Sequence, residues 1–550
     1  MSGAVESLLL AWVAAFLIAL GAVWAMRWLT IRVGMVDLPD PTRKLHRGAV
    51  SLGGGIAILL SLAVVLVLIQ AVSRSPLAIS LIGDWFGDDT AAYAKAGLSW
   101  GYRLTVLAVA AFLITLFGVI DDFVPLSGTT KLLFQIGITA LIGSFWIPAG
   151  NIEIFGLPLT IGALSGPLLM FWLLASINAV NLIDGADGVA GGFGVVSSLG
   201  IAAVAWISGN ETVAVLAAIL SAALAAFLCF NRPPATIFLG DAGSMLVGLL
   251  LGALACLSVS EAMFKQDLLL PIALVGVPLF DSLVAITRRW LTGRSIYSGD
   301  RGHIHHLVLA GLKSRQMSPT WIIPIFGGLA SVTAIGAVVS TAVRRDYPAV
   351  LSIVLLVGGL VGFRVFGYAE ARLLAAHSWR FAAGNWRRFR RGEHRSHVSG
   401  VVLQGSRQWD LIWQPLVQFA ERNDLRGMRL DLNMPWLHEG YHGSWSRGAR
   451  GEAPEQWSVR LPIICQGRVV GRLDIEGQAT GDGQIRSLET FSFLIAELQP
   501  AIDRLVCSID AREPGRDPSS DADEVSDDSS VGAIHAFPDP KADVARAARA

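Results

Sequence analysis

Apolar runs long enough to cross a membrane constrain this chain more than any other feature. A helix needs about 20 such residues to cross about 30 Å of hydrocarbon. The composition agrees, because 16% of the residues are charged, against about 25% in soluble proteins. We therefore predict an all-α polytopic membrane protein with about eleven transmembrane helices. The expected spans are 7–26, 54–72, 102–120, 132–148, 157–177, 193–208, 212–230, 244–259, 267–287, 321–343 and 348–368.

The polar segments between these runs fall into two sets, according to whether an odd or an even number of runs precedes them. Lys and Arg are concentrated in the odd set, above all in 27–47 and 288–315. The positive-inside rule places that face in the cytoplasm. We expect a multi-pass protein of the cell (inner) membrane whose odd loops and carboxyl terminus are cytoplasmic. The loops in question are 37–48, 121–123, 178–192, 230–244 and 288–306.

The third of these loops, N-A-V-N-L-I-D-G-A-D-G-V-A-G-G, interrupts the apolar series with two amides and two carboxylates. An unpaired charge at bilayer depth costs several kcal/mol, so these groups must face water, protein or a ligand. The glycines allow backbone N–H groups to approach a bulky partner such as a nucleotide. A glycine-rich turn between two helices explains the same residues without a ligand. The four polar residues are Asn178, Asn181, Asp184 and Asp187.

Each of the other loops also has a plain explanation on its own. Asp121 and Asp122 could be solvated carboxylates at a helix end, and Asp241 could cap a helix. The histidines within 303–306 could lie at the membrane interface. Together on one face, however, these groups suit a phosphate-rich substrate held through a divalent cation. Mg²⁺ prefers carboxylate and phosphate oxygens, and phosphoryl transfer depends mainly on positioning and charge neutralisation.

Five ordered motifs occupy the five loops. They are D-x-P-x-x-x-R-K-x-H with a Gly pair (37–55), D-D with a downstream Lys (121–131), N-x-x-N-x-x-D-G-x-D-G (178–188), F-x-G-D-x-G-S (238–244) and D-R-x-H-I-H-H (300–306). With these motifs, residues 1 to about 368 resemble the WecA/MraY superfamily of polyprenyl-phosphate N-acetylhexosamine-1-phosphate transferases. The R-K-x-H and H-x-H-H forms look like the branch that uses UDP-N-acetylglucosamine. Ser51 stands where this branch usually has proline, which leaves the local turn open.

This resemblance implies an enzyme that moves N-acetylglucosamine 1-phosphate, or a related N-acetylhexosamine 1-phosphate, from a UDP-sugar to undecaprenyl or another polyprenyl phosphate. UMP would leave, and the lipid product would initiate a cell-envelope polysaccharide. The resemblance also implies Mg²⁺, with Mn²⁺ as the alternative, bound by Asp241 and shared by Asp121 and Asp122. The two neighbouring carboxylates would position or deprotonate the lipid phosphate. Because a phosphomonoester is largely ionised at neutral pH, positioning is the more important role.

The resemblance extends to three groups of substrate contacts. The nucleotide would be held by Asn181, Asp184 and Asp187, with Phe238 stacking on uracil. The diphosphate or sugar would meet cationic donors that offset developing negative charge, namely Arg301, His303, His305 and His306. Further expected contacts without an assigned role are Lys44, His46, Lys131 and Asn178. Two charged residues, Asp281 and Arg288, lie near the end of the ninth run. Each either forms a structural pair within the protein or contacts substrate.

Beyond residue 370 the composition changes. Segment 371–400 interleaves Trp and Phe with Arg and is expected to lie on lipid head groups of the inner leaflet. Residues 401–510 predict a small soluble α/β module, with a helix near 409–422, a strand pair around Gln466–Gly467 and a helix at 485–505. The module weakly resembles the last half of a GAF domain. Residues 511–550 are rich in Asp, Ser and Pro, so we predict a disordered tail after the module.

Two functions from other classes also fit parts of the sequence. A transporter or flippase places carboxylates in the membrane, but near the midplane in broken helices, whereas these motifs lie at the ends of the runs. A membrane-tethered sensor would make the soluble module the working part and leave the five loops unexplained. The formal net charge of +0 argues against nucleic acid as a partner. The sequence leaves the sugar, the prenyl length and the choice between monomer and homodimer open.

Overall fold

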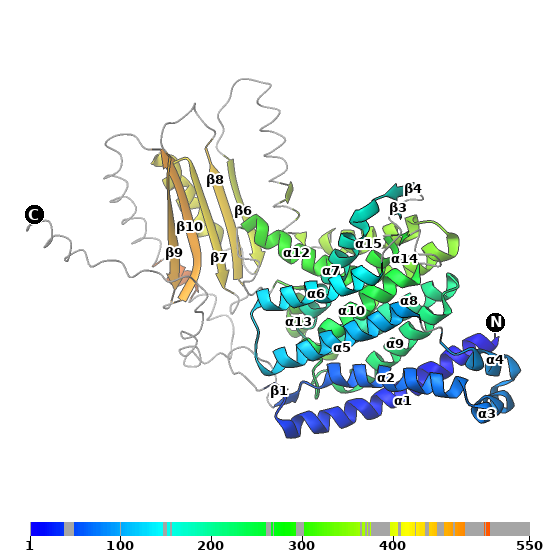
Figure 1. The fold of residues 1–550 in the computed structure, drawn as a ribbon. Helices are drawn as coiled ribbons and strands as arrows, with labels where there is room; N and C mark the ends of the chain where they lie inside the picture. The colour runs from blue at the N-terminus through cyan, green and yellow to red at the C-terminus, as the bar shows by residue number, and fades with distance from the viewer. Residues whose placement is uncertain are drawn as a thin grey trace, which may run out of the picture.

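The structure is a computed structural model in which most described residues are helical, as predicted. It describes residues 2–37, 49–98, 101–146, 151–154, 157–259, 266–267, 269–292, 302–362, 366–368, 371, 374–375, 397–404, 409–423, 425–434, 439–447, 456–465, 468–478, 500 and 502–506. The helices of residues 2–362 form a bundle (Figure 1). They are α1 (Ser2–Val33), α2 (Gly54–Ser73), α3 (Pro76–Phe86), α4 (Asp88–Ala96), α5 (Tyr102–Phe123), α6 (Gly128–Phe145), α7 (Ser165–Ile183), α8 (Val189–Ile207), α9 (Glu211–Asn231), α10 (Gly240–Ser258), α11 (Leu269–Leu274), α12 (Gly276–Thr292), α13 (Ile304–Ser314), α14 (Ile322–Val343) and α15 (Tyr347–Gly362).

Eight helical segments of the described chain are long and apolar enough to cross a membrane, which makes this a multi-pass membrane protein. They correspond to α1, α2, α5, α7, α8, α9, α10 and α14. Three further expected spans correspond to α6, to the pair α11 and α12, and to α15, which has 16 residues. The total of eleven spans therefore stays a prediction.

Two of the expected spans have different bounds in the structure. Residues 157–160 are a strand, β4 (Leu157–Thr160), paired with β3 (Asn151–Ile154), and α7 begins only at Ser165. Hydrophobicity alone does not separate a short apolar strand from the start of a helix. The ninth run is divided between α11 and α12. Pro278 lacks an N–H and its ring conflicts with the carbonyl four residues earlier, at Leu274, where α11 ends.

Five short elements of secondary structure lie in the connections of the described bundle. The strand β5 (Gln266–Asp267) pairs in parallel with β3, and β1 (Val36–Asp37) pairs with β2 (Val50–Ser51). Two short 3₁₀ turns, η1 (Gly162–Leu164) and η2 (Pro319–Trp321), lead into α7 and α14.

Helix α10 is the most buried of the eight apolar segments, because 78% of the residues in its most apolar 18-residue stretch are buried inside the protein. Glycines bring three neighbouring helices close to it. A Cβ added at Gly55 of α2 would lie 2.3 Å from the Gly243 nitrogen, and one at Gly118 of α5 would lie 2.3 Å from the Ala242 Cα. At Gly248 of α10, a Cβ would lie 2.7 Å from Ile177 of α7. Small residues permit such close helix approach in membranes, and here they gather α2, α5 and α7 around the amino-terminal half of α10.

The described part of the soluble module forms a five-stranded antiparallel sheet with the order β6-β8-β7-β10-β9, on which α17 (Asp410–Arg422) packs. Residues 502–506 are also helical and add Ile502 and Val506 to the same core. This core, which contains Trp409, Trp413 and Trp445, is separate from the core of the bundle. The helix and the strand pair were therefore predicted correctly. The strands are β6 (His397–Gln404), β7 (Gly427–Met434), β8 (Glu439–Ser446), β9 (Gln456–Cys465) and β10 (Arg468–Gln478).

The segment predicted to lie on lipid and the last predicted helix are described only in part. Strand β6 begins at His397, inside the segment expected to lie on lipid. Most of 371–396, most of the predicted helix 485–505 and the whole tail 511–550 lie outside the described residues. The likeness to a GAF domain stays a prediction.

Candidate active site

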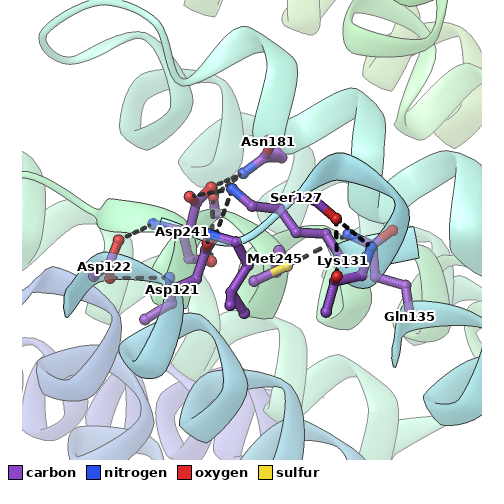
Figure 2. A network of polar contacts seen from close by, with 12 residues as sticks. Asp121, Asp122, Ser127, Lys131, Gln135, Asn181, Asp241 and Met245 are labelled. Atoms are coloured by element: carbon purple, nitrogen blue, oxygen red, sulfur yellow. Dashed lines mark hydrogen bonds and ion pairs between the residues drawn. The ribbon is translucent and has the colours of Figure 1, made fainter. Parts of the chain in front are cut away.

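Four helices bring together two carboxylates, an ammonium group and an amide, which we call the acidic centre (Asp121, Lys131, Asn181 and Asp241; Figure 2). Lys131 Nζ lies 2.5 Å from Asp121 Oδ2 and 2.9 Å from Asp241 Oδ2. Asn181 Nδ2 donates to Asp241 Oδ1 at 2.6 Å. The Asp121 side chain is 1% exposed, whereas those of Lys131 and Asp241 are each 29% exposed. The centre is therefore accessible from the side of Lys131 and Asp241.

Local hydrogen bonds explain why the centre is built at helix ends. Asp121 Oδ1 accepts from the Leu126 N–H at 2.8 Å, which closes the end of α5. The Ser127 side chain accepts from the Thr130 N–H and caps α6, so that Lys131 lies in the first turn of that helix. These groups are at the ends of α5 and α6, as expected for a site at the membrane surface.

Asn181 ties α7 to the first turn of α10. Besides bonding Asp241, its Nδ2 donates to Ser244 Oγ at 2.7 Å. Ser244 follows Asp241 by three residues, so the two acceptors lie on the same face of α10. One amide therefore fixes both side chains of the G-D-x-G-S motif.

Asp122 points away from the acidic centre and into the backbone of α10. Its Oδ1 accepts from the Asp241 N–H at 2.8 Å, and its Oδ2 accepts from the Ala242 N–H at 3.3 Å. The first N–H groups of a helix have no partner inside that helix, and Asp122 supplies one from α5. Gly240 has φ +70, and a Cβ there would lie 2.6 Å from Asp122 Oδ2. Sharing of a metal ion by Asp122 stays a prediction, because its oxygens here bond the backbone.

The loop between α7 and α8, residues 184–188, is called the glycine-rich loop. It is held against the connection between α9 and α10. Asp187 Oδ2 accepts from the Ala235 N–H at 2.9 Å. The Gly188 N–H donates to Asn231 Oδ1 at 2.8 Å, and Asn231 Nδ2 donates to the Ile237 carbonyl at 2.8 Å. Gly188 has φ +78, a conformation that favours glycine. Asn231 is not among the predicted site residues, because its only signal in the sequence is a polar residue at the end of an apolar run.

Negative charge accumulates at this end of the bundle. Reduced hydration of its carboxyl group, followed by the charges of Asp241, Asp122 and Asp187, raises the pKa of Asp184 well above its usual value. Lys131 contacts two carboxylates at this end of the bundle, Asp121 and Asp241. The arrangement therefore favours binding of a further cation.

Phe238 and Ser51 connect the site to the start of α2. The Phe238 N–H donates to the Ser51 carbonyl at 2.7 Å, and the Phe238 carbonyl accepts from the Gly54 N–H at 3.0 Å. Ser51 Oγ lies 2.6 Å from Thr30 Oγ1 and accepts from the Gly53 N–H at 3.2 Å. Ser51 stands where the related branch usually has proline, and its hydroxyl forms the hydrogen bonds of this turn. Stacking of Phe238 on uracil stays a prediction.

Four other predicted substrate contacts are not seen in the acidic centre. Asn178 lies one helical turn before Asn181 and donates instead to Gln135 Oε1 at 2.7 Å, on α6. Lys44, His46 and Arg301 lie outside the described residues.

The predicted histidines form a histidine cluster (His303, His305 and His306). The His303 and His305 rings are parallel with centroids 5.7 Å apart, and those of His305 and His306 are 4.2 Å apart. A Cβ added at Gly185 would lie 2.5 Å from His305 Nε2, so the cluster packs against the residue that follows Asp184. Burial, then the neighbouring His306 and His303, lower the pKa of His305 well below its usual value. The neutral ring thus meets the glycine-rich loop.

The donor set of the acidic centre suits a hard divalent cation, although Lys131 stands between the two carboxylates. No three His, Cys, Asp or Glu side chains of the described chain are arranged to hold a metal ion by themselves. Mg²⁺ in phosphate-handling sites commonly uses one or two carboxylates, with water and substrate phosphates as its other ligands. Asp121 and Asp241 fit that requirement.

Comparison with known proteins gives consistent matches to one group of enzymes. The family model described as glycosyl transferase family 4 matches residues 104–259. The "Probable undecaprenyl-phosphate N-acetylglucosaminyl 1-phosphate transferase" of Bacillus subtilis is 31% identical over 312 residues, 56% of this chain and 78% of that protein. The "Decaprenyl-phosphate N-acetylglucosaminephosphotransferase" of Mycolicibacterium smegmatis is 34% identical over 240 residues, 39% of this chain and 58% of the relative.

A third relative extends the match to another group of bacteria. The "Undecaprenyl-phosphate alpha-N-acetylglucosaminyl 1-phosphate transferase" of Escherichia coli K12 is 27% identical over 296 residues, covering 52% of this chain and 72% of that protein. These relatives share the family that the five loop motifs indicated. The chain therefore belongs to glycosyl transferase family 4, the WecA/MraY-like family of membrane transferases.

Proposed function

We propose that this protein transfers N-acetylglucosamine 1-phosphate from UDP-N-acetylglucosamine to a polyprenyl phosphate and releases UMP. The observation that carries the proposal is the acidic centre, where Lys131 bridges Asp121 and Asp241 at the ends of their helices. The relatives are named for undecaprenyl or decaprenyl phosphate as acceptor and for N-acetylglucosamine as the group moved. An enzyme that joins these substrates needs phosphate-binding chemistry at a membrane surface.

The reaction exchanges one phosphoanhydride for another. An oxygen of the lipid phosphate attacks the β-phosphorus of the UDP-sugar, the bond to the UMP oxygen breaks, and UMP leaves. Because the lipid phosphate is already largely ionised, the protein needs to orient it and to reduce charge repulsion rather than to supply a strong base. The partly exposed Lys131 ammonium suits the lipid phosphate, and Asp121 fixes its position through their ion pair.

We assign Mg²⁺, with Mn²⁺ as the alternative, to Asp241 and Asp121. When bound, the ion neutralises the diphosphate of the donor. Asp122 contributes by holding the first turn of α10, from which Asp241 projects. Of the three predicted metal ligands, two then act directly and the third acts through the backbone.

The other parts of the site are assigned to the donor. The loop containing Asp184 and Asp187 would hold the nucleotide, since its fixed backbone and glycines permit close approach. The histidine cluster, which packs against that loop at Gly185, would contact the diphosphate or sugar.

The excess of Lys and Arg in the odd loops supports a cytoplasmic active face, where nucleotide sugars would be used. We place the protein in the inner membrane and its lipid product at the start of a cell-envelope polysaccharide. The homodimer remains a separate proposal, to be tested by the size of the purified protein in detergent.

A membrane assay tests the function directly. Full-length protein in detergent is mixed with polyprenyl phosphate, Mg²⁺ and UDP-sugars labelled in the sugar, and the label is followed into the lipid phase. We expect UDP-N-acetylglucosamine to label lipid, and radioactive UMP to exchange back into UDP-sugar because the equilibrium lies near unity. EDTA should stop both signals. Well-folded protein that gives neither labelling nor exchange with any UDP-N-acetylhexosamine would overturn the proposal.

A further inference from the structure

Helix α12 holds the chain just before α13 through a buried carboxylate. Asp281 is 1% exposed, and both of its oxygens contact the start of α13. Oδ2 lies 3.1 Å from His303 Nδ1, and Oδ1 accepts from the Ile304 N–H at 3.0 Å. One side chain thus fixes both an imidazole ring and the first backbone donor of a helix.

A second residue of α12 holds the same segment. Arg288 Nη2 donates to the Gly302 carbonyl at 3.0 Å, and a Cβ at Gly302 would lie 1.6 Å from Arg288 Nη1. Arg288 follows Asp281 by seven residues, about two helical turns, so the two side chains lie on one face of α12. The sequence left open whether Asp281 and Arg288 form structural pairs or contact substrate. In the structure both side chains contact residues 302–304 of the protein.

The contact to His303 determines which ring nitrogen carries the proton. A carboxylate is only an acceptor, so the hydrogen lies on Nδ1 and is donated to Asp281. Nε2 is then the nitrogen available to a ligand. An imidazole held in this way by a carboxylate keeps one tautomer and one ring orientation.

The orientation of the His303 ring affects His305, because the two rings pack against each other. The His303 ring stacks in parallel on His305, which lies against Gly185 of the glycine-rich loop. We propose that Asp281 is a positioning residue for the proposed transfer reaction, which holds His303 in the Nδ1–H tautomer and sets the histidine cluster against that loop. The role in turnover rests on the proposed function, whereas the tautomer of His303 does not.

Steady-state kinetics of Asp281→Asn test the role in turnover. The amide keeps the size and an acceptor for the Ile304 N–H, but it removes the carboxylate from His303. We expect kcat to fall about 10- to 100-fold, as when the partner of a ligand histidine is lost, with little change in KM for the UDP-sugar. Ile114→Val is the matched control, because Ile114 is fully buried like Asp281 but lies on a different helix, α5, and its kcat should stay unchanged.

A double-mutant cycle with His303→Gln separates positioning from general support of the fold. If Asp281 acts through His303, then Asp281→Asn should lower kcat no further in a His303→Gln background. Additive losses would overturn the proposal, as would an equal loss of kcat in Ile114→Val.

A spectroscopic measurement tests the tautomer even if the chain transfers no sugar phosphate. In protein labelled with ¹⁵N-histidine, the signals that disappear in His303→Gln belong to His303. We expect protonated Nδ1 in the wild type and a shift toward protonated Nε2 in Asp281→Asn. A wild-type His303 protonated on Nε2 alone would overturn the assignment, even where Asp281→Asn does not fold. Failure of the proposed function would appear instead as absent lipid labelling with the Nδ1 signature intact.

Discussion

The membrane bundle and the soluble module pair their carboxylates in different ways. In the module, two carboxylates each accept from a donor of their own: Trp409 Nε1 donates to Glu439 at 2.8 Å, and the Tyr441 hydroxyl donates to Asp410 at 2.7 Å. In the bundle, Asp121 and Asp241 share the single ammonium group of Lys131, with further carboxylates close by.

The difference indicates where ligands bind. A matched donor and acceptor satisfy each other and need nothing more. Carboxylates that lie close together destabilise one another, and such groups cluster where a protein binds or reacts with something. On this contrast we predict that catalysis takes place in the bundle and that the module is an accessory.

The largest effect should come from Asp241→Asn, which removes a carboxylate from the middle of the acidic centre while keeping its shape. Losing one contact of this kind costs about 3–4 kcal/mol, or roughly 10²–10³ in kcat. Lipid labelling by purified protein measures the loss, and thermal melting should change little. Asp88→Asn, at an exposed position that starts α4, is the control with unchanged turnover. Near wild-type turnover in Asp241→Asn at saturating Mg²⁺ would place the metal ion elsewhere.

The neighbouring pair Asp121 and Asp122 should respond differently to the same substitution. Asp121→Asn removes the charge that holds Lys131, so kcat should fall about 10²-fold. Asp122→Asn weakens the cap on α10, which typically costs about 1 kcal/mol of stability, and it should lower kcat less. Kinetics and melting curves of both variants decide. Identical profiles would show that the two carboxylates share one role.

The histidine cluster should make the bundle sensitive to mild acid. The pKa of His305 is lowered by burial, then by His306 and His303, so the folded chain keeps His305 neutral while the unfolded chain binds a proton below about pH 6.5. The contribution of His305 to stability is therefore complete above that pH and is lost as the pH drops, by at most about 1.4 kcal/mol per unit.

Melting of the bundle at about pH 7.5 and 5.5 checks this expectation. The difference between the two melting temperatures should shrink in His305→Gln. An unchanged difference would mean that other groups carry the acid sensitivity.

Much of the site could be predicted because membrane topology limits where polar loops meet. Alternation of spans predicted that Asp121, Asn181 and Asp241 lie on one face. In the structure Asn181 bonds Asp241, and Lys131 joins Asp241 to Asp121. The sequence did not separate Asp121 from Asp122, because the two are chemically identical and only the helix rotation of about 100° per residue sends one to Lys131 and the other to the backbone of α10.

Other features depended on distant partners. The role of Asp281 stayed open because His303 follows it by 22 residues, with no periodicity to connect the two. The split of the ninth run and the late start of α7 were missed because a hydropathy pattern does not register a proline at a helix break or a short apolar strand.

The smallest effect should come from removing the module. Truncation after residue 392 leaves out all five strands of its sheet, and the module has a hydrophobic core separate from that of the bundle. The acidic centre, the glycine-rich loop and the histidine cluster all lie before residue 307. We expect turnover per mole of folded protein to stay within about twofold of the full-length value, because distant and independently packed regions contribute additively.

A full-length control makes this test specific. Glu439→Ala leaves Trp409 Nε1 without its acceptor, which should unfold the module at lower temperature without lowering turnover. If the truncated protein is well folded but inactive, and Glu439→Ala also lowers turnover, the module takes part in catalysis. The contrast between matched polar pairs and crowded carboxylates would then not divide the chain by function, and the sensor hypothesis, in which the bundle only anchors the module, would gain support.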